Sequence, residues 1–457
     1  MPFPLTRTLG EFAAHLTFDR LPARVIEAVR LGFTDCIAVM LAGADEPVAR
    51  IVRDTLARPA ERDEARLWPG FMRTSAVSAA LANGAAAHAL DYDDVALAGH
   101  PSVVLVPAIL AEAEAMGADG RAAVTAYAAG YETWARLVER DPDPYHRKGW
   151  HPTAVIGPVA AAAALANLRG LDQMRATMAL AIAASMSGGL VANFGSMTKP
   201  FQAGRAAAAG VAAARLAAAG MTASEDAIEH PLGLLAALSP AGRADRDSSI
   251  EGLGRAWRLA DKGLNVKKYP LCYATHRALD GMLDLVGTHD VSPDDVARIE
   301  VEIGRTQAAM LRNHRPQTGL EAKFSMEFAM ASALVARRAG LGELTDAFVR
   351  RPDVQAAMEK VSITTTETVA EDDPVFAASD RVALVLADGR QLASPDIRFA
   401  RGHWFAPLDR DQLWAKFRDC AAGRLDDDAM QALFDALQSL ERAPNLRTLG
   451  AEAAVAA

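Results

Sequence analysis

The residues best suited to chemistry begin at 83–94, where three aspartates lie within four residues directly after an apolar stretch. Carboxylates in such a position could act as general bases, bind a cation or cap the next helix. Asp91 is the candidate base, because its neighbourhood is apolar and a carboxylate kept from water can have a raised pKa. Asp93 and Asp94 fit a helix cap or a solvated loop better. His100 follows in a Gly-His-Pro sequence.

Two further histidines lie beside apolar helical patterns. His88 is three residues before Asp91 on a helical pattern, and a satisfied core histidine is its favoured interpretation. His151 is the stronger candidate, because the following proline places it in an extended turn before an apolar helix. There, His151 and the hydroxyl of Thr153 could bind an anionic substrate group or move a proton. A purely structural role for the segment 146–153 is the alternative.

A single lysine, Lys199, lies between a long uncharged segment and an alanine-rich helix. Lysine is rarely buried without a partner. Lys199 could therefore hold a substrate carboxylate or stabilise a developing enolate. The alternative is a loop lysine whose ammonium group reaches solvent.

The predicted domain junction offers Lys268, Tyr273 and His276, in a stretch that also holds a thiol and a second phenol. Domain junctions are preferred positions for ligand pockets, so Lys268 and Tyr273 are candidate substrate-binding residues. The alternative for the lysines is a solvated polar linker. Lys323 and Ser325 begin the next predicted helix, where capping and surface charge explain their types at least as well.

Several chemistries lack their sequence patterns. There is no H-E-x-x-H or paired C-x-x-C, so we expect no metal, although Asp91, His100 and His151 could in principle meet at one. A phosphate loop and a strand-flanked G-x-G-x-x-G are absent, which argues against nucleotide binding. The absence of a G-x-S-x-G elbow disfavours a serine hydrolase.

Helices dominate the first part of the chain, because alanine-rich apolar stretches alternate with Gly, Pro and Asp and no convincing period-2 run appears. Asp172 and the capping-box pattern at 222–225 mark helix starts. Small side chains on every face would let these helices approach closely. The expected helices cover 22–43, 75–90, 103–117, 121–139, 154–168, 172–187 and 203–219.

Strand patterns appear after residue 265. Apolar and charged residues alternate over 298–303, 361–366 is β-branched, and 382–386 is followed by the hairpin dipeptide Asp-Gly. A helical pattern at 322–339 lies between the first two strands. These patterns predict a small α+β domain.

The predicted fold is mainly α. Residues 1–265 form a large all-α helical domain, 266–408 form a smaller inserted α+β domain, and 409–457 form a helical tail that packs back onto the first domain. A chain of 457 residues is long enough for at least two domains.

Composition limits the partners. The chain has 48 Lys and Arg against 57 Asp and Glu, a net charge of −9, which argues against a nucleic-acid or anionic-membrane binder. Three scattered cysteines argue against a disulfide framework and favour a reducing compartment. The uncharged segment 176–198 is long enough to cross a bilayer, but its serines, glycines and asparagine favour a buried helix and a loop. We therefore expect a cytoplasmic protein.

Five motifs, taken in order, resemble the signatures of the MmgE/PrpD family, which includes 2-methylcitrate dehydratase, cis-aconitate decarboxylase and iminodisuccinate epimerase. They are Asn83-Gly…His88…Asp91-Tyr-Asp-Asp94…His100-Pro, Gly149-Trp-His-Pro-Thr153, Met197-Thr-Lys-Pro200, Lys268-Tyr-Pro…Thr275-His276 and Ala322-Lys-Phe-Ser325. The match extends from about residue 10 to about residue 420, and five ordered motifs make chance improbable.

The resemblance implies a helical domain made from both chain ends, a smaller inserted α+β domain, an active site in the cleft, and a homodimer without metal or organic cofactor. It places active-site positions at Asp91, His100, His151, Lys199 and His276. These residues would bind substrate carboxylates, neutralise a developing enolate and transfer the proton.

The family implies a small di- or tricarboxylic acid substrate and, first, a lyase of the 2-methylcitrate dehydratase type. An epimerase of an iminodicarboxylic acid is the alternative, followed by a cis-aconitate decarboxylase. Val95 stands where the family often has a hydroxyl residue, and His403-Trp-Phe-Ala-Pro407 departs from the usual polar stretch. The missing hydroxyl weakens a dehydratase or decarboxylase assignment. A non-catalytic interaction protein would have lost these ionisable positions, which all persist.

Overall fold

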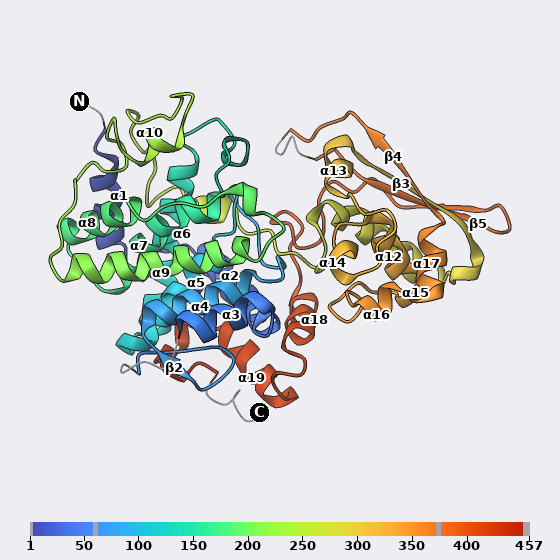
Figure 1. Cartoon of the computed structure of the whole chain (residues 1–457), viewed down its shortest axis with the longest axis horizontal. Helices are drawn as coiled ribbons and strands as arrows, with labels where there is room; N and C mark the ends of the chain where they lie inside the picture. The colour runs from blue at the N-terminus through green and yellow to red at the C-terminus, as the bar shows by residue number, and fades with distance from the viewer. Residues whose placement is uncertain (1–2, 58–62, 372–375, 451–457) are drawn as a thin grey trace. The chain divides into compact units, whose positions relative to one another are not determined.

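The computed structural model describes residues 3–57, 63–371 and 376–450, and they divide into two compact units (Figure 1). Unit 1 contains Met1–Leu264 and Trp414–Ala457, and unit 2 contains Asn265–Leu413. The predicted mainly helical class is confirmed. The predicted domain boundaries at 265/266 and 408/409 lie close to this division, and the last predicted residues, 451–457, lie outside the described ones. An inserted, independently folded α+β domain stays a prediction.

Unit 1 is built from helices and one very short hairpin. The two-residue strands β1 (Ala65–Arg66) and β2 (Arg73–Thr74) pair antiparallel and were not predicted. The helices are α1 (Leu5–His15), α2 (Ala23–Gly43), α3 (Pro47–Leu56), α4 (Ala76–His88), α5 (Ser102–Met116), α6 (Gly120–Val138), α7 (Pro152–Leu168), α8 (Gln173–Ala184), α9 (Thr198–Ala218), α10 (Leu234–Leu238), α11 (Arg258–Asp261), α18 (Arg410–Ala421, which begins in unit 2) and α19 (Asp427–Gln438).

Helix α9 lies between α4 and α7 in the centre of unit 1 (Figure 1). Two glycines allow α4 and α9 to approach closely. A Cβ on Gly84 would lie 2.8 Å from the Cα of Gly204, and a Cβ on Gly204 would lie 2.2 Å from the carbonyl oxygen of Leu81. This contact places the C-terminal end of α4, at His88, beside the N-terminal end of α9, at Lys199.

Side-chain caps fix several helix starts. The side chain of Asp172 accepts a hydrogen bond from the backbone of Arg175 and caps α8, as predicted. The predicted helix start at 222–225 is wrong, because this segment forms coil and turn. Ser224 instead bonds to Asp226 within the turn, which shows a local side-chain bond replacing a helix cap.

The C-terminal helices belong to unit 1. Helix α19 packs against α2, and its Phe434 lies 5.5 Å from Phe417 of α18, centroid to centroid. Arg30 of α2 also donates hydrogen bonds to Glu441. The predicted packing of the tail against the first segment is therefore present within unit 1. No helix among the described residues is long and apolar enough to cross a membrane.

Unit 2 contains a four-stranded sheet in the order β4-β3-β5-β6. The pair β3/β4 is parallel, whereas β3/β5 and β5/β6 are antiparallel. The elements are α12 (His276–His289), β3 (Val296–Gly304), α13 (Arg305–Met310), α14 (Gly319–Ala322), α15 (Met326–Ala336), α16 (Asp346–Val349), α17 (Pro352–Met358), β4 (Val361–Thr366), β5 (Arg381–Leu386) and β6 (Gln391–Ala393).

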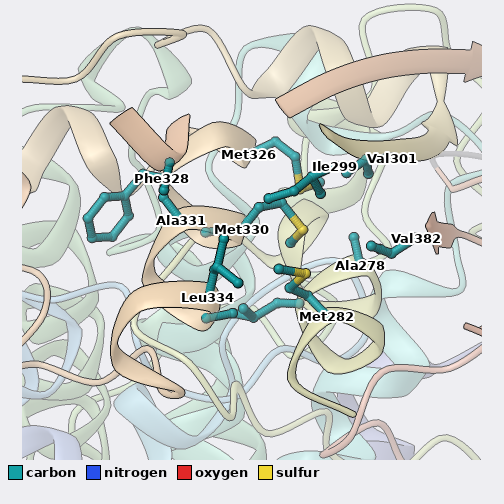
Figure 2. Close-up of a cluster of buried hydrophobic side chains, with 14 of the residues drawn as sticks. Ala278, Met282, Ile299, Val301, Met326, Phe328, Met330, Ala331, Leu334 and Val382 are labelled. Carbon is teal, nitrogen blue, oxygen red and sulfur yellow. The ribbon is translucent and has the colours of Figure 1, made fainter. Parts of the chain in front are cut away.

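One face of this sheet and the helices α12 and α15 form the core of unit 2 (Figure 2). Ile299, Val301 and Ile303 are buried and alternate with more exposed residues, as the period-2 pattern predicts. The helix predicted at 322–339 is interrupted, because Ser325 caps a new helix through the backbone of Phe328. This break separates α14 from α15.

Candidate active site

Three of the predicted catalytic residues meet in unit 1. The ammonium group of Lys199 donates a hydrogen bond to Oδ1 of Asp91 at 2.8 Å, and Nε2 of His100 lies 3.8 Å from the same oxygen. The side chains of Asp91, Lys199 and His100 are 31%, 14% and 13% exposed. This group is thus partly open to solvent, as a site that binds a small molecule requires.

Asp93 connects two histidines behind this group. Its Oδ1 lies 2.9 Å from Nδ1 of His88, and its Oδ2 lies 2.7 Å from Nδ1 of His100. Burial alone would raise the pKa of Asp93, but the two histidines hold it well below its usual value. An ionised carboxylate only accepts hydrogen bonds, so each histidine donates from Nδ1 and presents its Nε2 elsewhere.

The predicted cap or solvated-loop roles of Asp93 and Asp94 are wrong, because both side chains are fully buried and α5 begins without a side-chain cap. Burial, reinforced by Asp35, raises the pKa of Asp94 well above its usual value. Burial lowers the pKa of His88 to about 4, which keeps the imidazole neutral. His88 is a buried, bonded histidine, as expected, but its partner belongs to the site.

His151 is also held neutral. Its Nδ1 lies 2.7 Å from Oε1 of Gln202, whose amide nitrogen donates to the carbonyl oxygen of Leu190 at 3.3 Å. This second bond orients the amide, so Nδ1 carries the proton and Nε2 carries the lone pair. Burial lowers the pKa of His151 to about 2. A direct role for His151 in binding an anionic substrate group or moving a proton stays a prediction.

Helix starts place these side chains. His151 immediately precedes α7, with Pro152 in the first turn, and its backbone donates to the carbonyl oxygen of Gly189. Lys199 lies in the first turn of α9, and His100 lies two residues before α5. The first-turn N–H groups of a helix favour anions. The cluster thus contains residues from the N-terminal ends of α5, α7 and α9, which suits the binding of a carboxylate substrate.

Two residues that sequence reasoning did not select, Gln202 and Phe194, also line the cluster. Gln202 orients His151, and the ring of Phe194 lies 4.9 Å from that of His151 and 5.8 Å from that of His146. The Nζ of Lys199 lies 5.2 Å from the Phe194 ring. Both residues lie in the segment 193–205 that carries Lys199, which was a sequence signal for them. It was not used, because an aromatic ring and an amide do not by themselves indicate a catalytic role.

Thr153 is fully buried, and its hydroxyl oxygen accepts a hydrogen bond from the backbone of His100 at 3.2 Å. In the described residues this hydroxyl therefore supports the turn that carries His100. A direct contact between Thr153 and substrate stays a prediction.

A metal ion could be accommodated by the same donors. His88, Asp91, Asp93 and His100 each offer a ligand atom, and these atoms lie within 4.8 Å of one another. The carboxylates are, however, already in contact with Lys199 and the two histidines, so a divalent cation would have to displace these contacts. The donor set fits a hydrogen-bonded cluster better, and the expectation of no metal stays a prediction.

The other predicted site residues belong to unit 2. His276 is fully buried at the start of α12, where Nε2 lies 3.2 Å from the carbonyl oxygen of Leu271. The ring of Tyr273 lies 4.9 Å from that of His276 and lines a small cavity of about 60 Å³. Lys268 lies over the ring of Tyr269, and burial lowers the pKa of Lys268. The three residues thus gather at one place in unit 2.

Lys323 and Ser325 have structural positions in unit 2. Ser325 caps α15, and Lys323 is 8% exposed, so the surface-charge interpretation of this lysine is wrong. Its carbonyl oxygen accepts a hydrogen bond from the backbone of Cys272. This bond ties the start of α15 to the segment that carries Tyr273.

Two protein-family models match most of the chain. The MmgE/PrpD N-terminal domain matches residues 7–247, and the MmgE/PrpD C-terminal domain matches residues 269–441. The chain belongs to the MmgE/PrpD family. The resemblance inferred from the five motifs is confirmed.

Curated relatives in the MmgE/PrpD family match nearly the whole chain. The cis-aconitate decarboxylase of Mus musculus is 27% identical over 456 residues, covering 96% of this chain and 91% of that protein. The human cis-aconitate decarboxylase is 27% identical over 453 residues, covering 96% and 92%. That of Aspergillus terreus is 24% identical over 471 residues, covering 97% and 95%. These relatives support an enzyme of the lyase type.

The short loop before His100 is a tight turn in this MmgE/PrpD chain. Ala96 and Gly99 exchange both backbone hydrogen bonds at 3.0 Å, while Leu97 and Ala98 between them have positive φ angles of 48° and 62°. A Cβ on Gly99 would lie 2.7 Å from the ring of Trp134, so only glycine fits there. The turn fixes where His100 leaves the backbone.

Proposed function

We propose that this chain is a lyase that decarboxylates a small, unsaturated tricarboxylic acid of the cis-aconitate type. The ion pair between Lys199 and Asp91, with His100 at 3.8 Å from the same carboxylate oxygen, carries the proposal. The curated relatives move the preferred reaction from the dehydration favoured by the sequence to decarboxylation. Val95, which supplies no hydroxyl for proton relay, weighs against both reactions equally.

Decarboxylation presents the site with a transient carbanion. The bond between carbon and the leaving carboxylate breaks, carbon dioxide departs, and the electron pair spreads towards a remaining carboxylate before a proton adds to carbon. A cation near that carboxylate stabilises this charge. Lys199, in the first turn of α9, can supply the positive charge together with the helix N–H groups.

Proton delivery is assigned to His100, assisted by Asp91. Asp93 holds Nδ1 of His100, so Nε2 is the atom that exchanges the proton, and the ring is partly exposed to solvent. General acid–base catalysis needs a group within reach of both substrate and water. His151 presents a neutral Nε2, which can accept a hydrogen bond from a protonated carboxyl or hydroxyl group.

Substrate binding is proposed to involve Lys268, Tyr273 and His276 of unit 2 as well, because they add a cation, a phenol and an imidazole that suit a polycarboxylate. We further propose a cytoplasmic homodimer that uses no organic cofactor, as the family resemblance implies. Analytical ultracentrifugation of the purified chain tests the dimer directly.

Proton NMR of the purified protein in deuterated water, with a panel of citrate-like, aconitate-like and iminodicarboxylate acids, tests the reaction. We expect loss of carbon dioxide from an aconitate-like acid and incorporation of one deuterium into the product. Loss of water would indicate a dehydratase. Deuterium next to a carboxylate without a change in composition would indicate an epimerase, and either result would refute decarboxylation.

Two histidine variants of unit 1 provide the matched comparison. His100→Ala removes the proposed proton donor and is expected to slow turnover by about 10²–10⁴-fold. His15→Ala removes an exposed histidine whose Nδ1 only contacts the carbonyl oxygen of Glu11, so turnover should not change. Equal turnover in the two variants would remove His100 from the proposed mechanism.

A further inference from the structure

Lys416 of α18 reaches the aspartate loop from far along the chain. Its ammonium group donates a hydrogen bond to the backbone carbonyl oxygen of Tyr92 at 2.9 Å and forms an ion pair with Asp35 of α2. The same nitrogen lies 4.0 Å from the centre of the Tyr92 ring. Lys416 is 4% exposed and Asp35 is fully buried, so these contacts are shielded from water.

The carbonyl group bound by Lys416 lies between the two aspartates that contact the other residues of the cluster. Tyr92 follows Asp91, which pairs with Lys199, and precedes Asp93, which holds His88 and His100. Asp91 itself adopts a left-handed backbone conformation with φ of 50°, which is costly for a residue other than glycine. Such a conformation persists only where its surroundings fix it.

We propose that Lys416 is a positioning residue for the site: by binding the Tyr92 carbonyl it fixes the left-handed turn at Asp91 and thereby the relative placement of Asp91 and Asp93. This inference rests on the proposed function, and it assigns Lys416 no contact with substrate. The ion pair with Asp35 has a different role. It compensates the buried charge of Asp35, whose carboxylate is also stabilised by the backbone of Asp94, and the bond to Tyr92 sets the turn at Asp91.

These two roles can be separated because they use different partners. Lys416→Met alone leaves the Asp35 carboxylate buried without its cation and should lower stability as well as turnover. In the double variant Lys416→Met/Asp35→Asn both charges are gone, which is often neutral or stabilising for a buried pair, and the new amide oxygen can still accept the hydrogen bond that Asp35 takes from the backbone of Asp94. The Tyr92 carbonyl still lacks its cation in this double variant.

The expected result is that the double variant regains most of the thermal stability lost by Lys416→Met, while turnover stays about 10²-fold below that of the wild type, because displacement by about 1 Å can cost this much. Amide hydrogen exchange over residues 91–94 should be faster than in the wild type. Recovery of both stability and turnover in the double variant would overturn the proposal.

A second variant covers the case in which the double variant fails to fold. Asp35→Asn keeps Lys416 and its bond to Tyr92, so turnover should stay within about threefold of the wild type even if the melting temperature falls. A loss of turnover as large as that of Lys416→Met, at a similar loss of melting temperature, would show that stability alone explains the effect.

A matched control links the same two parts of the chain without touching the loop. Arg30 of α2 pairs with Glu441, near the C-terminal end, and Arg30→Met/Glu441→Leu removes that pair. Its turnover and its exchange over 91–94 should equal those of the wild type. Hydrogen exchange needs no substrate, so it tests the role of Lys416 even if the wild type decarboxylates no acid, a result that would refute only the proposed function.

Discussion

Asp93→Asn is the most informative single change in the aspartate loop. Oδ1 of the carboxylate accepts a hydrogen bond from His88 at 2.9 Å, and Oδ2 lies 2.7 Å from Nδ1 of His100, which also donates to the backbone carbonyl oxygen of Asp94 at 3.1 Å. An amide of the same shape has one oxygen that accepts and one NH₂ group that only donates. The histidine that faces the new NH₂ group therefore either moves its proton from Nδ1 to Nε2 or loses this contact, and His100 can keep its Nδ1 proton on the carbonyl oxygen of Asp94.

The size of the effect follows from what this tautomer change removes. If the one proton of a neutral His100 moves to Nε2, that atom cannot accept a proton and could give its proton up only by leaving an imidazolate, so acid–base assistance of about 10²–10⁴-fold is lost. Stability should change less. One charge-assisted hydrogen bond is lost, a cost of about 1.5–3 kcal/mol, which the easier burial of a neutral amide partly offsets.

Turnover of the substrate found by the NMR panel and thermal melting measure these two effects. Nitrogen-15 NMR of labelled histidines reports which ring nitrogen carries the proton. Asp172→Asn is the control, because asparagine caps a helix as well as aspartate does and α8 is remote from the proposed chemistry. Unchanged tautomers of both histidines, or a His100 proton moved to Nε2 with less than a threefold loss of turnover, would refute this reasoning.

Three other changes have expected outcomes in unit 1. Burial lowers the pKa of His88 to about 4, so below pH 6.5 the unfolded chain binds one proton more than the folded chain. The loss of stability caused by His88→Asn, measured by urea titration, should therefore shrink by about 1.4 kcal/mol per pH unit from pH 6.5 to 5. A loss that does not change with pH would contradict this. Gln202→Glu places a carboxylate at Nδ1 of His151 and should raise the pKa of that histidine by about 1–3 units. The NMR titration of His151 measures this shift, and an unchanged titration would show that residue 202 does not contact the ring. Gly204→Ala adds a Cβ that would lie 2.2 Å from the backbone oxygen of Leu81, so the melting temperature should fall by several degrees, and an unchanged value would contradict the close packing of α4 and α9.

The helical part of the fold was largely predictable from the sequence. Caps such as Asp172, and the alanine-rich periodicity, place most helices within a few residues. Where local signals compete, sequence reasoning failed. The pattern at 222–225 has the residues of a capping box, but the following residues form turns and Pro231 interrupts any helix there. The helix predicted from 203 begins at Thr198, which brings Lys199 into its first turn.

The site was predictable only where residue type alone points to chemistry. Asp91, His100, His151 and Lys199 could be selected in that way, and the structure brings all four into one cluster of unit 1. Asp93 could not be separated from a solvated loop residue, because its burial depends on helices distant in sequence. Lys416 carries no local signal, since its partner Tyr92 lies 324 residues away.

The central claim is that the cluster around Lys199 decarboxylates a polycarboxylic acid. Carbon dioxide release from cis-aconitate is the most direct measurement, made with the wild type, Lys199→Met and, as the matched control, Lys262→Met, which removes an exposed lysine of unit 1. We expect the wild type and Lys262→Met to release carbon dioxide. We expect Lys199→Met to release it at a rate at least about 10²-fold lower, at an unchanged melting temperature. No release by the wild type, or equal release by all three proteins, would contradict it.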